Sequence, residues 1–260
     1  MSSYAILGAT GNVGSSLLQL LSKNSTNEIH VFVRSRSKLF NLLPAVKDQS
    51  NVIVYEGQIQ DVDLIAKCIH NTKAVFQATA LSENVPGCSI ATDTIKVVVE
   101  ALRILRSQDD KEKLPKLVVL SSASVTDKFW KGVPRFVHRT IYNANCYIYD
   151  DLREAEKYLR DQQDWIAATF MKPGGLVSDV ERGHELSLDE CHTFMSFLDL
   201  AAAMIEVADT GDDRWDMKDV SLVPQTVGAR FEYMAPYVLG KGLVACFFPQ
   251  LYMSLRAWIP

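Results

Sequence analysis

Residues 4–14 read YAILGATGNVG, a short apolar run that leads directly into three glycines spaced three positions apart. We expect Gly8 to permit a tight turn, Gly11 to let another group approach the backbone closely, and Gly14 to let a helix pack on the strand. Residues 13–21 follow with apolar side chains at helical spacing. A helix that begins at such a loop offers free N–H groups and a partial positive charge to an anion. The position of the glycines between a strand and a helix therefore predicts a loop that holds the pyrophosphate of a dinucleotide.

Strand-like and helix-like segments alternate along the rest of the first two thirds of the chain. Helical patterns start near residue 61 and occupy residues 95–105 and 144–160. Apolar or β-branched runs between them predict strands at residues 28–33, 51–55, 74–78, 116–121 and 165–170. This alternation predicts an α/β fold built on a doubly wound parallel sheet.

The pattern becomes looser after Pro173, where only a helix at residues 199–208 and a last strand at residues 219–223 are evident. The length of 260 residues lies between one and two average domains. We therefore predict a dinucleotide-binding domain over residues 1–175. We predict that residues 176–260 form a small substrate lobe packed on it.

Composition and charge exclude several functional classes. The net charge of −4 gives no basic footprint for nucleic acid. The five cysteines are odd in number and widely spaced, which favours reduced thiols and a cytoplasmic protein without a secretory signal. Cys191, His192 and His184 have poor spacing for a metal site, so none is predicted. A serine hydrolase is disfavoured because the sequence has no G-x-S-x-G motif.

The C-terminal tail, residues 233–253, is strongly apolar but is interrupted by prolines, glycines and a lysine. A membrane span needs roughly 20 uninterrupted apolar residues. We expect the tail to pack on the fold or to line a pocket, with weak contact to a membrane surface as the less favoured alternative. Such a tail would suit a bulky apolar small-molecule substrate.

The second predicted strand ends in a basic segment that contains Arg34, Arg36 and Lys38. Enzymes that prefer NAD usually carry an acidic residue here, which binds the 2′-hydroxyl of the ribose. Arg34 stands in that place, and a guanidinium pairs with a 2′-phosphate through charge-assisted hydrogen bonds. The sequence therefore predicts NADP(H) as the cofactor. The alternative is a solvated basic loop.

Several motifs in order along the chain resemble the atypical short-chain dehydrogenases, and more narrowly their NmrA-like branch. The glycine loop and Arg34 match that family best. The looser matches are residues 57–61 (GQIQD), 120–123 (LSSA), 164–165 (DW), 172–175 (KPGG) and 199–201 (DLA). In the first of these, Gln58 replaces an acid that is usual in the family.

The resemblance implies a Rossmann domain and a set of cofactor-binding positions at the ends of its strands. Many family members oxidise or reduce small molecules, fungal members include secondary-metabolite tailoring enzymes and cyclases, and others are NADP(H)-binding regulators without turnover. The predicted cofactor-binding residues are Gly8, Thr10, Gly11, Asn12, Val13, Gly14, Arg34, Arg36, Lys38, Gln58, Ile59, Thr79, Ala80, Ser121, Pro173, Gly174 and Gly175.

The usual catalytic tyrosine and lysine of short-chain dehydrogenases, spaced Y-x-x-x-K, are missing. The expected positions fall at Ile148 and Leu152, which are apolar. We therefore predict Ser122, Tyr147 and Tyr149 as candidate catalytic residues, although each tyrosine has a simpler interpretation as a packing residue. Hydride exchange with an iminium or conjugated system needs orientation and electrostatics more than a strong protein acid.

The sequence is compatible with two functions. The first is an NADP(H)-dependent oxidoreductase, or a redox-assisted cyclase, that acts on a bulky apolar metabolite in secondary-metabolite biosynthesis. The second is a non-catalytic NADP(H)-sensing regulator of the NmrA type that binds a partner protein. The glycine loop is common to both, and the missing dyad favours either the regulator or unusual chemistry.

Overall fold

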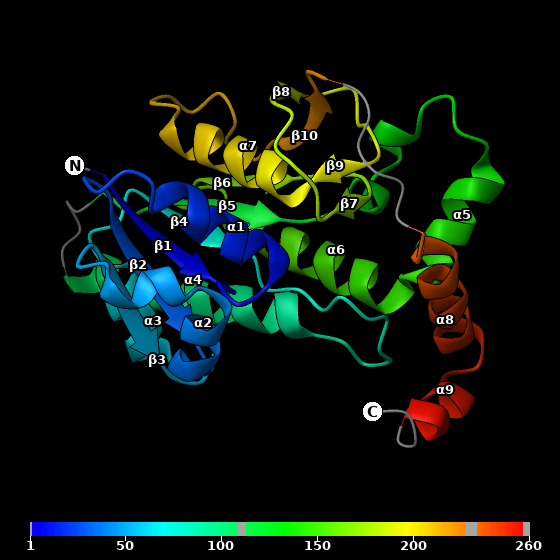
Figure 1. Ribbon diagram of the computed structural model, residues 1–260, viewed down its shortest axis with the longest axis horizontal. Helices are drawn as coiled ribbons and strands as arrows, with labels where there is room; N and C mark the ends of the chain where they lie inside the picture. Colours follow the sequence, from blue (N-terminus) through cyan, green and yellow to red (C-terminus); the bar gives the residue numbers. More distant parts are fainter. Residues whose placement is uncertain (1, 109–112, 227–232, 257–260) are drawn as a thin grey trace.

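An eight-stranded sheet forms the centre of the molecule in the computed structural model, which describes residues 2–108, 113–226 and 233–256 (Figure 1). The strand order is β3-β2-β1-β4-β5-β6-β10-β8, and all neighbours are parallel except β10 and β8. The strands are β1 (Ser3–Leu7), β2 (Glu28–Val33), β3 (Val52–Glu56), β4 (Ala74–Gln77), β5 (Lys116–Leu120), β6 (Ala168–Met171), β10 (Asp219–Pro224) and β8 (His184–Ser187). The predicted doubly wound parallel sheet is confirmed.

Helices cover both faces of this sheet, and each face has its own apolar core. On one face, α1 (Asn12–Leu21) packs beside α7 (Phe197–Asp209), with α2 (Arg36–Leu42) near them. On the other face, α4 (Ile90–Gln108) lies between α3 (Val62–Ile69) and α6 (Cys146–Arg160). The central strands are buried on both sides, which explains why their sequences are continuously apolar.

The structure corrects three details of the predicted element pattern. The predicted strand at residues 165–170 begins at Ala168 instead, because the Trp165 and Ile166 N–H groups donate to the Gln162 carbonyl in a turn. The sequence pattern did not predict α2, which Ser35 caps, α5 (Arg135–Ala144), strand β8, or the helices α8 (Ala235–Phe247) and α9 (Pro249–Arg256). A small second sheet also joins β7 (Leu176–Val177) to β9 (Met195–Ser196).

The part of the chain after residue 175 has two different environments. Strands β10 and β8 extend the main sheet, and α7 packs in the core that also holds α1. In contrast, α8 (Ala235–Phe247) and α9 (Pro249–Arg256) form a helical pair that contacts α5 at one end of the molecule (Figure 1). The boundary at residue 175 therefore stays a prediction, and residues 227–232 and 257–260 of the predicted lobe lie outside the described residues.

The helical pair leaves many of its apolar side chains exposed. Gly242, Ala245 and Tyr252 face inward, while Tyr237, Phe247, Phe248 and Leu251 are more than half exposed. No helix within the described ranges combines the length and the apolar character that crossing a bilayer requires.

Candidate functional site

The glycine loop connects β1 to α1 at the carboxyl edge of the sheet. Gly8 has a φ of +97°, and the register of β1 with β4 places it against Ala78, whose carbonyl carbon and oxygen would lie 2.8 Å from an added Cβ. A Cβ on Gly14 would lie 2.2 Å from the Gly8 oxygen. These two close approaches explain why the loop requires glycine at both positions. The loop therefore presents the first-turn N–H groups of α1, which have no acceptor within the helix.

A cavity of about 660 Å³ opens beside this loop. Its walls come from the carboxyl ends of β1 to β4, the segment after β4 and the start of α4. The predicted cofactor-binding residues that line it are Gly8, Thr10, Gly11, Arg34, Lys38, Gln58, Ile59, Thr79 and Ala80. The fold thus gathers residues from four separate segments into one cavity whose size suits part of a dinucleotide.

The three basic residues after β2 do not share one environment. Arg34 and Lys38 line the cavity and are exposed. Arg36 instead donates from its guanidinium to the Val54 carbonyl at 2.9 Å and lies 3.8 Å from a Glu56 carboxylate oxygen. The structure therefore brings two of the three predicted cations to the cavity and places the third against β3.

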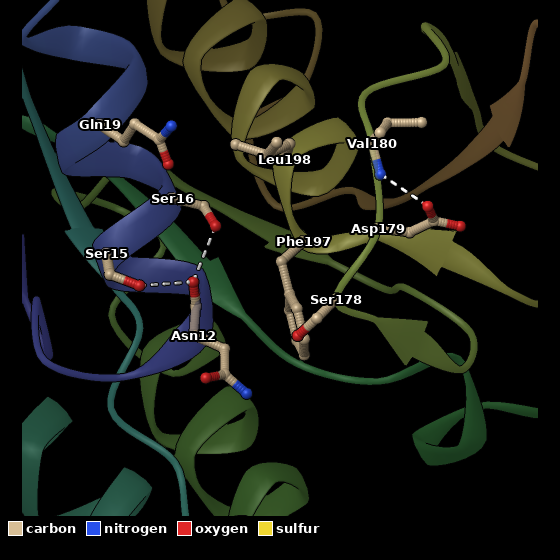
Figure 2. Close-up of a pocket in the computed structure, with 9 residues that line it drawn as sticks. All are labelled: Asn12, Ser15, Ser16, Gln19, Ser178, Asp179, Val180, Phe197 and Leu198. Carbon is tan, nitrogen blue, oxygen red and sulfur yellow. Dashed lines mark hydrogen bonds between the residues drawn. The ribbon is translucent and has the colours of Figure 1, made fainter. Parts of the chain in front are cut away.

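The side chains of Asn12 and Val13 also lie outside this cavity. Val13 is buried in the core between α1 and α7. Asn12 lines a second cavity of about 480 Å³. Figure 2 shows Asn12, Ser15 and Ser16 of α1 on one side and Phe197 of α7 on the other, with both serine hydroxyls donating to the Asn12 carbonyl. Any role of the buried Val13 toward a cofactor would therefore use its backbone N–H group.

A buried cluster of charged and polar side chains lies where β5 and β6 end. The β5–β6 register places Ser121 beside Lys172, and α6 contributes Glu156. The Lys172 side chain is fully buried, donates to the Ser121 hydroxyl at 3.3 Å and pairs with the Glu156 carboxylate, which also accepts from Ser121. Ser121, a predicted cofactor-binding residue, therefore points its hydroxyl into the protein.

Asp219 and Arg160 extend this cluster toward β10. The Lys172 ammonium lies 3.6 Å from Asp219, and Arg160 donates to the same carboxylate at 2.8 Å. The sequence interpretation missed Glu156 and Lys172 as site candidates. A signal was present for Glu156, because it shares a helix face with the inward residues Leu152 and Leu159.

Ser122 and the glycine-rich segment after β6 are adjacent. The Ser122 hydroxyl oxygen accepts from the Ser124 N–H at 3.2 Å and so caps a short 3-10 helix, Ala123–Val125. The Ala123 N–H donates to the Pro173 carbonyl at 2.9 Å. Gly175 donates to Thr193 and accepts from Met195, so residues 193–195 cover one side of this segment. The structure thus places Ser122 beside the Pro173–Gly175 segment, and its catalytic role stays a prediction.

The candidate tyrosines are at the start of α6. Tyr147 is half-buried, and burial is the main cause that raises the pKa of its phenol. Tyr149 packs on the core between α4 and α6, with its ring centroid 5.6 Å from that of Tyr142. Ile148 and Leu152, at the positions expected for the usual dyad, are buried apolar residues of that core. Tyr147 therefore retains the properties of a neutral hydrogen-bond donor, whereas Tyr149 has those of a packing residue.

Asp151 is a second residue that the sequence interpretation missed. Its buried carboxylate accepts from the Ala91 and Thr92 N–H groups at 2.8 and 2.9 Å, so it caps the start of α4. Ile90 and Asp93, in the same turn, line the 660 Å³ cavity. Asp151 therefore links α6 to the cavity wall.

No group of three or more potential metal ligands occurs among the residues that the structure describes. The glycine cradle fits the pyrophosphate of a dinucleotide, because added side-chain atoms at Gly8 and Gly14 would collide with backbone.

Comparisons with known proteins agree with this geometry. A family described as NAD(P)H-binding matches residues 8–210. The chain is 43% identical to oxidoreductase AgnL4 of Paecilomyces divaricatus over 261 residues, which covers both chains completely. It is 44% identical to oxidoreductase stcQ of Emericella nidulans, over 98% of this chain and 94% of that protein.

Solved structures show the same fold at low sequence identity. A short-chain dehydrogenase/reductase from Veillonella parvula, crystallised with NADP, has a TM-score of 0.66 and 18% identity. The alignment covers 86% of this chain and 95% of that structure. Together with the glycine cradle and the cavity beside it, these matches show that the chain belongs to the NAD(P)H-binding family of Rossmann-type proteins.

Proposed function

We propose that this protein is an NADP(H)-dependent oxidoreductase that exchanges hydride with a bulky, largely apolar small molecule of secondary metabolism. The observation that carries the proposal is the 660 Å³ cavity, in which the glycine loop and the cations Arg34 and Lys38 line the same space. The relatives named oxidoreductases support the redox activity. The secondary-metabolite role rests on the resemblance to fungal tailoring enzymes.

The preference for NADP(H) over NAD(H) is assigned to Arg34 and Lys38. Both side chains line the cavity, and neither makes an ion pair among the described residues. A 2′-phosphate would supply the anion that they lack, through charge-assisted hydrogen bonds. Gly8 and Gly14 would hold the pyrophosphate at the start of α1, and residues 173–175 would border the nicotinamide.

Replacing Arg34 with alanine tests this assignment. We expect Arg34→Ala to weaken NADPH binding about 10–100-fold, the equivalent of one or two lost charge-assisted hydrogen bonds. NADH binding should change much less, because NADH has no 2′-phosphate. Fluorescence titration with both cofactors measures the difference. Arg36→Ala is the matched control, since Arg36 contacts Val54 and Glu56, and it should affect both cofactors alike. An equal loss for NADPH and NADH in Arg34→Ala would refute the assignment.

Catalysis in this proposal does not use the tyrosine–lysine dyad. The bound nicotinamide supplies the hydride chemistry, and the protein supplies orientation and hydrogen bonds. Ser122 lies beside the Pro173–Gly175 segment, because its neighbour Ala123 donates to the Pro173 carbonyl, and its O–H can donate while its oxygen caps the 3-10 helix. Tyr147 is the second donor candidate, because its half-buried phenol is a protonated hydroxyl at neutral pH, and burial raises its pKa further above the ordinary value. Ile148 and Leu152 stand at the positions expected for the usual tyrosine and lysine, and both are buried apolar residues, which supports catalysis without that dyad.

A cyclase variant of the proposal uses the same site. Gly8, Gly14 and residues 173–175 would hold a cofactor that supplies reversible hydride transfer, and the ring closure of a conjugated substrate would need no strong protein acid. Two cavities beside the site, lined in part by Phe129 and Phe197, offer apolar contacts for such a substrate. Neither includes a residue from α8 or α9, so the predicted role of the tail as a substrate wall stays a prediction.

A second candidate function is an NADP(H)-sensing regulator without turnover. The observation that favours it is the exposed apolar surface of α8 and α9, including Phe247 and Phe248, which a partner protein could cover. Deletion of the gene in the native host, followed by metabolite profiling, separates the two. The oxidoreductase predicts that one precursor accumulates and is consumed by the purified protein with NADPH. A changed metabolite profile without such turnover would favour the regulator.

A further inference from the structure

Two cysteine thiols meet where α8 crosses the start of α6. Cys146 is the first residue of α6, and Cys246 lies in the last turn of α8. The two thiols are neighbours, because Cys146 is among the groups that raise the pKa of Cys246, and both are partly buried. They come from segments far apart in the sequence, so their contact depends on the docking of α8.

The crossing that brings these thiols together is fixed by close backbone contact. A Cβ on Gly242 would lie 1.9 Å from the Ala144 carbonyl oxygen, so only glycine allows α8 to approach this closely. Gly242 precedes Cys246 by one helical turn, and Ala144 precedes Cys146 by two residues. The backbone contact therefore holds both cysteines at the same crossing.

Asn84 reinforces the crossing from a third segment. Its side chain is buried and donates to the Gly242 carbonyl at 3.1 Å and to the Cys146 sulfur at 3.7 Å. Its amide oxygen accepts from the Tyr147 N–H at 3.0 Å. One side chain thus joins α8, α6 and the segment after β4, whose neighbouring residues line the cofactor cavity.

The other cysteines have different surroundings. Cys68 is fully buried, and burial raises its pKa strongly. Cys88 donates to the Asp151 carboxylate at 3.4 Å, and Cys191 points toward the Lys172 carbonyl at 3.9 Å. Each of these three thiols therefore has oxygen or apolar atoms as neighbours, whereas Cys246 has the Cys146 thiol as its neighbour.

We propose that Cys146 and Cys246 are a modification site that forms a disulfide when the protein meets an oxidised low-molecular-weight thiol such as glutathione disulfide. One cysteine, as its thiolate, attacks a sulfur of glutathione disulfide and expels one glutathione thiolate. The second cysteine loses its proton and attacks the protein sulfur of the mixed disulfide, which expels the second glutathione. Two protein thiols are oxidised to one disulfide, and one glutathione disulfide is reduced to two glutathiones.

Burial and the neighbouring Cys146 raise the pKa of Cys246 to about 12. The exchange therefore needs an alkaline solution, because the thiolate is the reactive form. The product is a covalent bond that fixes α8 to the start of α6.

Thiol counting and peptide mapping test the proposal. The full-length protein is incubated with excess glutathione disulfide at about pH 8, where thiol exchange is efficient. We expect a loss of two of the five thiols and a linked pair of peptides that contain Cys146 and Cys246. Cys146→Ser and Cys246→Ser should each abolish the linked pair, and the control Cys191→Ser should retain it. Glutathione adducts without the linked pair, or a link between other cysteines, would overturn the proposal.

Thermal unfolding provides a second measurement that does not depend on cofactor binding or turnover. The disulfide closes a long loop in the unfolded chain, so the oxidised wild-type protein should melt several degrees above the reduced one. Cys246→Ser treated in the same way should show no rise. An equal rise in oxidised Cys246→Ser would overturn the proposal, because that variant cannot form the bond.

Discussion

The two halves of the candidate site are built by different physical means. The half beside the glycine loop consists of backbone, exposed cations and an open cavity. The half at the ends of β5 and β6 contains the fully buried Lys172, with Glu156 and Ser121 around it. Only the glycine loop of the first half comes from one short stretch of sequence, because the cavity beside it draws on four segments. The second half requires three separate elements. The shape of the loop is therefore set locally, whereas a buried charge needs the whole fold around it.

Removing the buried ammonium should have the largest effect. In Lys172→Met the Glu156 carboxylate stays buried but loses its nearest cation. Arg160, which lies 3.9 Å away, is then the nearest remaining cation described. Breaking one side of a buried ion pair costs about 3–5 kcal/mol, which we expect in the free energy of unfolding measured in urea. The double variant Lys172→Met/Glu156→Gln removes the stranded charge and should recover a large part of the loss. If the double variant is as unstable as Lys172→Met, the broken ion pair is not the cause of the lost stability.

Adding one methyl group at Gly14 should have the next largest effect. The new Cβ would lie 2.2 Å from the Gly8 oxygen, so the loop and the start of α1 must move apart. We expect Gly14→Ala to lower the free energy of unfolding by about 1–3 kcal/mol. We also expect it to weaken NADPH binding more than Lys172→Met does in the folded protein. Calorimetry and cofactor titration measure the two effects. Gly211→Ala is the control, because nothing lies within 4 Å of its added Cβ. A loss of stability without a loss of affinity would show that the loop does not hold the cofactor.

Asp151 should give the smallest of the three effects, since it caps a helix. Asp151→Ala removes the acceptor for two N–H groups of α4, and we expect a cost of about 0.5–2 kcal/mol. NADPH affinity should fall modestly because α4 begins at the cavity wall. Urea unfolding of Asp151→Ala and of the neighbouring Asp150→Ala provides a matched pair, as Asp150 is exposed and bonds only to Tyr142 among the contacts described. Equal costs for the two variants would contradict the capping role.

The central part of the fold could be predicted because its signals are local. Continuous apolar runs mark the buried parallel strands, and the helical spacing in α1 and α6 is visible in the sequence. The start of β6 was placed too early because Trp165, a good strand residue, is held in a turn by Gln162. The pattern after residue 173 was less informative, since β10 and β8 join the sheet through contacts distant in sequence.

The residues of the candidate site also divide into those that local sequence signals could place and those that depend on contacts distant in sequence. Gly8, Arg34 and Thr79 could be placed from the glycine motif and the strand ends, and the structure brings them to one cavity. Arg36 is close to Arg34 in sequence but turns toward Glu56, because the first turn of α2 rotates it away. Glu156 could not be paired with a partner from sequence alone, since Lys172 reaches it only through the packing of α6 on the sheet.

The hydrogen bond between Asn84 and Gly242 joins residues 158 positions apart. During synthesis the glycine loop, β1 to β4 and most of the cavity wall emerge long before α8 exists. Contacts between such distant segments form late, because the intervening chain must first be ordered. The segment around Asn84 therefore acquires its final partners only after α8 has left the ribosome, so a nascent chain without its last helices carries an unfinished cavity wall.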